Sequence, residues 1–285
     1  MIRAFAEIGK AIESGSCHYQ YVNKPTIATT GVAGQFYDLN QVSGVPRYNA
    51  FVGSQATFTP LNGSGNSGIY VGTFETGKTK HLARFQVHNP NVSGVLNDQV
   101  YLNDYLGFYP LIDCDSVDLQ EMDNTLSLPR YTDGKGVRIV LIVQAPTTNA
   151  ADLTITFIDD TNTERSITRT ICTGGVIGSC VTTAGLTGLV SSSTLFWPLA
   201  NGSLGVKSIK SVQFASAAGG FICLALVKPL ADIHMYEASV ASEKIYGINN
   251  IMPVEILPNA YLNLMLLRTG TANATLRAEL LFINT

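Results

Sequence analysis

One string of residues in the sequence matches a motif with known chemistry. Gly72-Thr-Phe-Glu-Thr-Gly77-Lys78-Thr79 fits the phosphate-binding loop G-x-x-x-x-G-K-[ST], in which backbone amides and the lysine hold phosphates and the hydroxyl holds magnesium. A working loop of this kind opens a helix whose N-terminus faces the phosphates. Residues 80–87 instead alternate as a strand does, and Phe74 and Glu75 stand inside the loop. We therefore interpret the string as a β-turn between two strands, and we predict no cofactor.

A cluster of acidic residues raises the possibility of a calcium site. Carboxylate oxygens are the ligands that calcium prefers, but the cluster lacks the glycine and the terminal glutamate of an EF-hand loop. We interpret it as a solvated loop, and a bound cation that stiffens the loop stays as the alternative. The cluster consists of Asp113, Asp115, Asp118, Glu121 and Asp123.

Histidines and cysteines show no spacing typical of a metal site or a nucleophile. His18, His81, His88 and His234 form no H-E-x-x-H pattern, and the five cysteines form no C-x-x-C pair. Cys17 and His18 are adjacent, so their side chains diverge in either regular structure, and no G-x-S-x-G elbow occurs. We predict no catalytic and no metal-binding residues, although a carboxylate pair for glycoside hydrolysis needs a spatial separation that no sequence spacing reveals.

The composition favours strands and limits the partners. Of the 285 residues 46% are hydrophobic and only 14% are charged, against roughly 25% in ordinary soluble domains. Thr, Ser, Asn and Gly replace the missing charge, as expected of pleated strands joined by turns. The net charge of −3 comes without a basic run, which argues against direct nucleic-acid binding. The longest apolar stretches, 137–143 and 221–227, are too short to span a membrane, and the cysteines suit a reducing cytosol.

The N-terminus carries the clearest helical pattern in the chain. Apolar residues recur at three-to-four-residue spacing over the first twelve positions, and Ser14-Gly15-Ser16 ends the pattern. So short a helix is marginal in water unless its apolar stripe packs on something. The stripe packs either on its own domain or, as an arm, on a neighbouring subunit. The candidate interface residues are Ile2, Phe5, Ile8 and Ile12.

Short apolar runs between turn residues predict the strands. They are expected at 50–58, 68–74, 81–87 and 137–143, and in three hairpins, 153–158 with 166–171, 206–215 with 221–227, and 261–267 with 275–283. The aromatic-rich run YLNDYLGFYPLID shows no clear helical or strand periodicity, so we assign no secondary structure to it. We predict an all-β fold, an antiparallel β-sandwich or jelly roll with a short N-terminal helix.

The expected organisation has three parts. A helical arm covers residues 1–16, an irregular β region rich in aromatic residues and glycine covers 17–136, and an antiparallel sandwich covers 137–285. The second and third parts form either two cores or one continuous domain.

A stretch from about Gly34 to Val137 resembles structural proteins encoded in tailed-bacteriophage gene clusters. The likeness rests on GQFYDLNQVSGVPRYNAFVG, on GIYVG with GKTKHL, and on YLGFYPLIDCDSVDLQEMDNTLSLPRYTDGKGV. It implies membership of the virion, with assembly in the host cytoplasm, and partners among the major capsid protein, other virion subunits or further copies of the chain. The function we expect is a capsid decoration or cement protein without enzymatic activity. A tail, fibre or receptor-binding subunit is the alternative, followed by a virion-associated carbohydrate-active enzyme.

Overall fold

The protein, seen in a computed structural model, is almost entirely antiparallel β-structure with one short helix, as the composition predicts. The structure describes residues 5–27, 34–63, 68–90, 95–172, 175–181, 195–237, 240–246, 253–269 and 274–285. The helix is α1 (Phe5–Glu13), and Gly15 follows it with a φ of +73°, in the left-handed region that glycine favours. The predicted helix is therefore confirmed from Phe5 onward.

The first sheet, which we call the terminal sheet, joins the first and last strands of the chain. Its order is β1-β16-β4-β13, and β14 also pairs with β4. β1 forms one edge and pairs along its length with β16, and among the described residues Asn23 adds a single bridge to Val45 on the other side. The strands are β1 (Cys17–Ile27), β4 (Lys80–His88), β13 (Ser242–Ile245), β14 (Val254–Ile256) and β16 (Ala274–Asn284).

The second sheet, the central sheet, closes on itself. Its order is β12-β7-β10-β2-β15-β5, β5 pairs back to β12, and β3 is attached to β5. The elements are β2 (Gln35–Asp38), the 3-10 helix η1 (Leu39–Gln41), β3 (Thr59–Pro60), β5 (Val95–Asp113), β7 (Arg138–Ala145), β10 (Ser179–Val181), β12 (Phe221–Glu237) and β15 (Leu262–Arg268).

The third sheet, the hairpin sheet, has the order β6-β11-β8-β9. β8 and β9 form the predicted hairpin, with Ala151 opposite Ile171 and Ile158 opposite Glu164. The strands are β6 (Gln120–Glu121), β8 (Ala151–Asp159), β9 (Glu164–Ile171) and β11 (Val206–Phe214).

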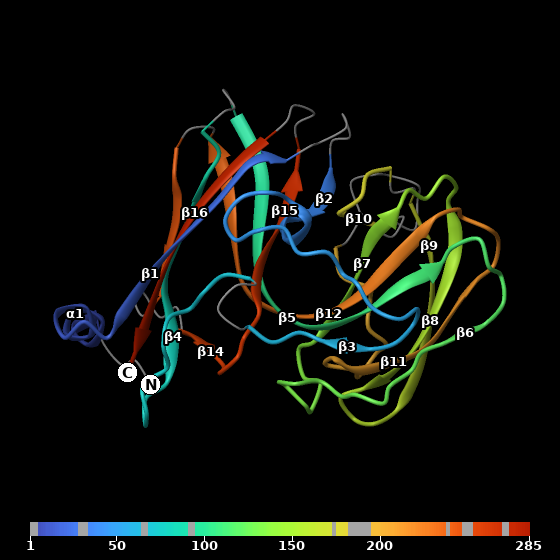
Figure 1. Cartoon of the computed structure of the whole chain (residues 1–285), viewed down its shortest axis with the longest axis horizontal. Helices are drawn as coiled ribbons and strands as arrows, with labels where there is room; N and C mark the ends of the chain where they lie inside the picture. Colours follow the sequence, from blue (N-terminus) through green and yellow to red (C-terminus); the bar gives the residue numbers. More distant parts are fainter. Residues whose placement is uncertain are drawn as a thin grey trace.

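The paired strands β5 and β12 connect the two ends of the molecule. They are 19 and 17 residues long and pair from Phe221 opposite Asp113 to Glu237 opposite Val95. Figure 1 shows them running from the group around β1, β16 and β4 to the group around β7, β8 and β11. One buried apolar cluster packs the hairpin sheet on the central sheet, a second packs the terminal sheet on it, and a third lies between strands of the central sheet.

Two of the three predicted hairpins are wrong in their pairing, although their strands are right. β11 pairs with β8 and β6, whereas β12 pairs with β5 and β7. Likewise, β15 belongs to the central sheet and β16 to the terminal sheet. In both cases the chain passes from one sheet to another between the two strands.

The strands predicted at 50–58 and 68–74 are also wrong. Both segments are irregular apart from short bridges, yet Phe51, Phe58, Ile69 and Val71 are buried. Their apolar residues pack onto the sheets without joining a ladder. The apolar run was therefore a signal of burial and not of strand pairing.

Strand pairing crosses the predicted division at residue 136 in every sheet. β1 and β4 pair with β16, β5 pairs with β12, and β6 pairs with β11. This pairing favours one continuous domain over two separate cores, the alternative that the sequence left open.

Candidate functional site

The phosphate-loop string forms a turn that leads into a strand. Thr76 and Gly77 make the turn, Gly77 has a φ of +78°, and β4 begins at Lys80. Lys78 pairs with Glu75 at 2.5 Å and donates to the Ser16 hydroxyl at 3.1 Å. The predicted turn is confirmed, and the segment before it is irregular where a strand was expected.

The acidic loop is closed by its own hydrogen bonds. Asp113 Oδ1 accepts the backbone N–H of Asp115, and the side chain of Gln120 bonds to both backbone groups of Asp113. Asp115, Asp118, Glu121 and Asp123 are exposed. Across the described residues, no group of three or more His, Cys, Asp or Glu side chains is placed to hold a metal ion.

Cys17 and His18 point to opposite faces of β1, as their adjacency predicts. Cys17 packs with the apolar group beneath α1, whereas the His18 ring meets Tyr70 edge-on with ring centres 5.0 Å apart. All five cysteines are free. Burial raises the pKa of the Cys114 thiol to about 12 and those of Cys180 and Cys223 well above their usual value.

The candidate interface on the N-terminal helix is only partly described. Ile2 and the side chains of Phe5 and Ile8 lie outside the described residues. Ile12 is 42% exposed, while its neighbour Ala11 packs against Ala83, Leu281 and Ile283 of the terminal sheet. The helix therefore touches its own sheet through Ala11 and leaves Ile12 at the surface.

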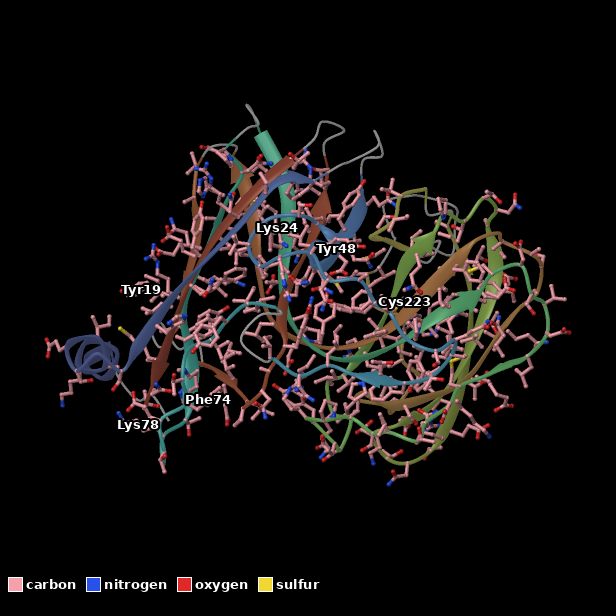
Figure 2. All side chains as sticks on the ribbon, viewed as in Figure 1. Tyr19, Lys24, Tyr48, Phe74, Lys78 and Cys223 are labelled. Atoms are coloured by element: carbon pink, nitrogen blue, oxygen red, sulfur yellow. The ribbon has the colours of Figure 1, made fainter. Side chains whose placement is uncertain are left out.

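Two tyrosines next to this helix form a surface that the sequence did not predict. Tyr19 and Tyr21 lie on the outward face of edge strand β1 and are 58% and 44% exposed. Figure 2 shows Tyr19 pointing away from the sheet on the side of α1, while Lys24 of the same strand points inward. The alternation C-H-Y-Q-Y-V could have indicated an outward aromatic pair. We call Ile12, Tyr19 and Tyr21 the β1 surface.

Buried charges fix irregular segments to the sheets. Arg130 donates twice to Asp104, at 2.9 and 2.7 Å, and also to the Leu61 and Tyr105 carbonyls. Asp98 accepts from Arg268 and from the backbone and hydroxyl of Thr269. Both pairs are almost fully buried, so each draws distant parts of the chain together.

A second kind of buried charge is a lone lysine among carbonyl oxygens. Lys24 Nζ donates to the Val42 and Pro46 carbonyls at 2.8 and 2.6 Å, and burial lowers its pKa to about 8. Asp38, which lies near enough to act on this lysine electrostatically, is itself fully buried, and burial raises its pKa to about 6. Its Oδ1 accepts from the Tyr105 hydroxyl at 2.7 Å.

Lys80 repeats this arrangement at the other end of the terminal sheet. Its Nζ donates to the Val71 and Thr73 carbonyls at 2.7 and 2.8 Å and lies 4.8 Å from the centre of the Phe74 ring. Directly opposite on β16 stands Asn284, whose Nδ2 reaches Thr73 O at 3.4 Å and Glu75 Oε1 at 3.1 Å. Sequence reasoning missed this group because Asn284 lies about two hundred positions away and carries no motif.

Two surface cavities are lined by apolar and uncharged polar residues. One, of about 200 Å³, is lined mainly by residues 69–74 with Asn259 and Ala260. The other, of about 270 Å³, lies among residues 48–53 with Gln41, Leu111, Gln144 and Ile177. Neither lining includes a carboxylate, a histidine, a cysteine or a lysine.

Comparison with known proteins gives no family. No model of a known protein family and no curated protein matches the chain. A structural match to the VP2 subviral particle of infectious bursal disease virus covers 94% of this chain and 81% of that chain, at 12% identity and a TM-score of 0.19. A match to the T13 particle of the same virus covers 94% and 77%, at 10% identity and a TM-score of 0.20. Such low scores assign neither fold nor function. Among the described residues, no helix is long and apolar enough to cross a membrane.

Proposed function

We propose that the chain is a structural subunit of a virus particle, and within that class a decoration or cement protein of a phage capsid. The β1 surface is the observation that carries this proposal. It consists of one aliphatic side chain on helix α1 and two aromatic side chains on edge strand β1. These three side chains are 42–58% exposed. Aromatic side chains supply large contact areas at low entropic cost, and they are enriched at protein interfaces.

The proposed mechanism is stabilisation by many repeated contacts. Each copy would bind across neighbouring capsid subunits, and icosahedral symmetry would repeat that contact over the shell. A partner that binds only the assembled state stabilises it by mass action. The low proportion of charged residues in the chain, only 14%, supports this role.

The proposal assigns no catalytic site to the chain. The buried ionisable groups described above are occupied by internal partners, as in Arg130–Asp104 and Arg268–Asp98. Lys24 and Lys80 are likewise held by backbone carbonyls. In this proposal, such groups hold the fold together.

Counting copies in purified virions tests the proposal. Quantitative mass spectrometry against the major capsid protein should find on the order of one copy per few capsid subunits, and a cryo-EM map should place the chain on the outer shell. A handful of copies at the tail would support the tail or fibre alternative. Complete absence from the particle would overturn the virion proposal.

A binding experiment tests the surface itself. The full-length Tyr19→Ser/Tyr21→Ser variant should bind shells lacking this protein at least tenfold more weakly than the wild type, because most interface energy resides in a few anchors. Tyr236→Ser is the matched control, since Tyr236 is 65% exposed but lies on the central sheet. Equal losses for both variants would show that the β1 surface is not the binding site.

A further inference from the structure

Lys80, Asn284 and Glu75 form a group in which three reactive side chains meet at one end of the terminal sheet. Lys80 and Asn284 are only 2% and 8% exposed and stand opposite each other in the ladder of β4 and β16. Lys80 Nζ and Asn284 Nδ2 both donate to the carbonyl of Thr73, at 2.8 and 3.4 Å. Glu75 Oε1 accepts from Asn284 Nδ2 at 3.1 Å. An amine, a primary amide and a carboxylate are therefore within one hydrogen-bonded group.

We propose that Lys80 and Asn284 join in an intramolecular isopeptide bond, with Glu75 transferring the proton. The lone pair of neutral Nζ attacks Cγ of Asn284, and the new N–C bond forms as the carbonyl electrons move to oxygen. The Glu75 carboxylate takes a proton from Nζ and returns it to Nδ2. The Cγ–Nδ2 bond then breaks, and ammonia leaves. One amine and one primary amide become one secondary amide and ammonia, with no change of oxidation state.

Several features of the site favour this reaction. The strand register holds amine and amide on the same face, which removes most of the entropic cost of bringing them together. Burial lowers the pKa of Lys80, which increases the fraction of neutral, nucleophilic amine. The carboxylate already contacts the leaving nitrogen, so Glu75 is a catalytic residue in this step.

The reaction requires one local rearrangement. Lys80 Nζ must leave the carbonyls of Val71 and Thr73 and rotate toward Cγ of Asn284. The backbone around the pair is fixed meanwhile, because Thr79 and Thr285 exchange two hydrogen bonds of 2.9 Å just beyond it. Only the lysine side chain therefore needs to move.

The bond would tie strand β4 to the last strand of the chain. It would enclose residues 80–284 in a covalent loop, which limits the freedom of the unfolded chain as a disulfide does. This inference does not rest on the virion proposal, because it concerns only the chemistry of three residues in one chain.

Mass spectrometry of the full-length protein tests the proposal. After prolonged incubation, the intact mass should fall by one ammonia. Trypsin should then release residues 79–84 joined through Lys80 to residues 278–285. Lys80→Arg and Asn284→Ala should abolish the joined peptide, and Glu75→Gln should slow its formation at least tenfold while the circular dichroism spectrum stays native.

Lys24 provides an internal control. It is also buried and held by two carbonyls, but the residue opposite it in the ladder is Leu276, whose side chain carries no amide. Lys24 should therefore appear in no cross-linked peptide, and Lys24→Arg should keep the loss of ammonia. An unchanged wild-type mass would overturn the proposal. So would a loss of ammonia that persists in Lys80→Arg, which would indicate cyclisation of an asparagine alone.

Discussion

The two ends of the molecule are stabilised by different physical means. The hairpin sheet packs on the central sheet through aliphatic and aromatic side chains such as Ile155, Phe157 and Phe214, all at most 1% exposed. The terminal side has a comparable apolar cluster and buries more charged side chains, namely Lys24, Lys80 and the Asp98–Arg268 pair. In the hairpin sheet, by comparison, Asp159 is buried and paired with the partly exposed Arg165. The hydrophobic effect stabilises buried apolar side chains whatever their orientation, whereas a buried charge is stable only with particular hydrogen-bond or ionic partners. The terminal side therefore depends more on specific contacts between distant segments.

The largest effect is expected from breaking a buried ion pair. Arg130→Met leaves Asp104 buried without its two guanidinium hydrogen bonds, and we expect the free energy of unfolding to fall by about 3–5 kcal/mol. Urea unfolding of the purified protein measures this loss. The double variant Arg130→Met/Asp104→Leu should recover a substantial part of it, because no buried charge remains. A loss below about 1 kcal/mol in the single variant would show that the pair is not needed there.

The next effect is the pH dependence of stability on the terminal side. The pKa of Asp38 is raised in the folded state to about 6 from 3.8, so stability is greatest below the unfolded value and decreases as the pH rises through 6. The pKa of Lys24 is lowered to about 8 from 10.5, so stability decreases as the pH falls through 8. Each contribution is on the order of 2–3 kcal/mol.

Variants at these two positions separate the contributions. Asp38→Asn should flatten the change between pH 4 and 6, and Lys24→Met should flatten the change between pH 8 and 10, as followed by thermal melts across pH. If the stability of Asp38→Asn still changes between pH 4 and 6 as that of the wild type does, a group other than Asp38 controls this change.

A smaller and pH-independent effect is expected in the hairpin core. Ile155 is fully buried opposite Ile167 and Val212. Ile155→Val removes one methylene and leaves a small cavity, at a cost of about 0.5–1.5 kcal/mol. The loss should be equal at pH 5 and pH 9, because no ionisable group is involved. A loss that changes with pH would weaken the contrast between the two ends of the molecule.

The strands were predicted correctly where the periodicity of apolar residues was enough to identify them. The strands after residue 136 alternate or run continuously apolar, and they were found as β7, β8, β9, β11 and β12. The pairing of β11 and β12 was missed because a turn shows where the chain reverses and says nothing about which strands bond. Their partners lie in different sheets.

The long strand β5 was missed for a different reason. Its aromatic-rich part has no clear period, and Asp98 and Asp104 stand among its apolar residues. Both carboxylates are satisfied by arginines far along the chain, Arg268 and Arg130. The Lys80–Asn284 group was missed likewise, because its members are far apart in the sequence. The alternation around Tyr19 and Tyr21 is local, but it does not show that their strand lies at the edge of a sheet. These features arise only from tertiary contacts.

The smallest effect concerns the exposed face of the hairpin sheet. Thr154 and Thr168 stand opposite each other on β8 and β9, with their hydroxyl oxygens 2.7 Å apart. A cross-strand pair of this kind contributes about 0.2–1 kcal/mol. A double-mutant cycle of Thr154→Ala and Thr168→Ala, measured by urea unfolding, should give a coupling energy in that range, far below the Arg130–Asp104 effect. A coupling as large as that of the buried pair would mean that the hairpin end also depends on directional contacts, and the distinction between the two ends would fail.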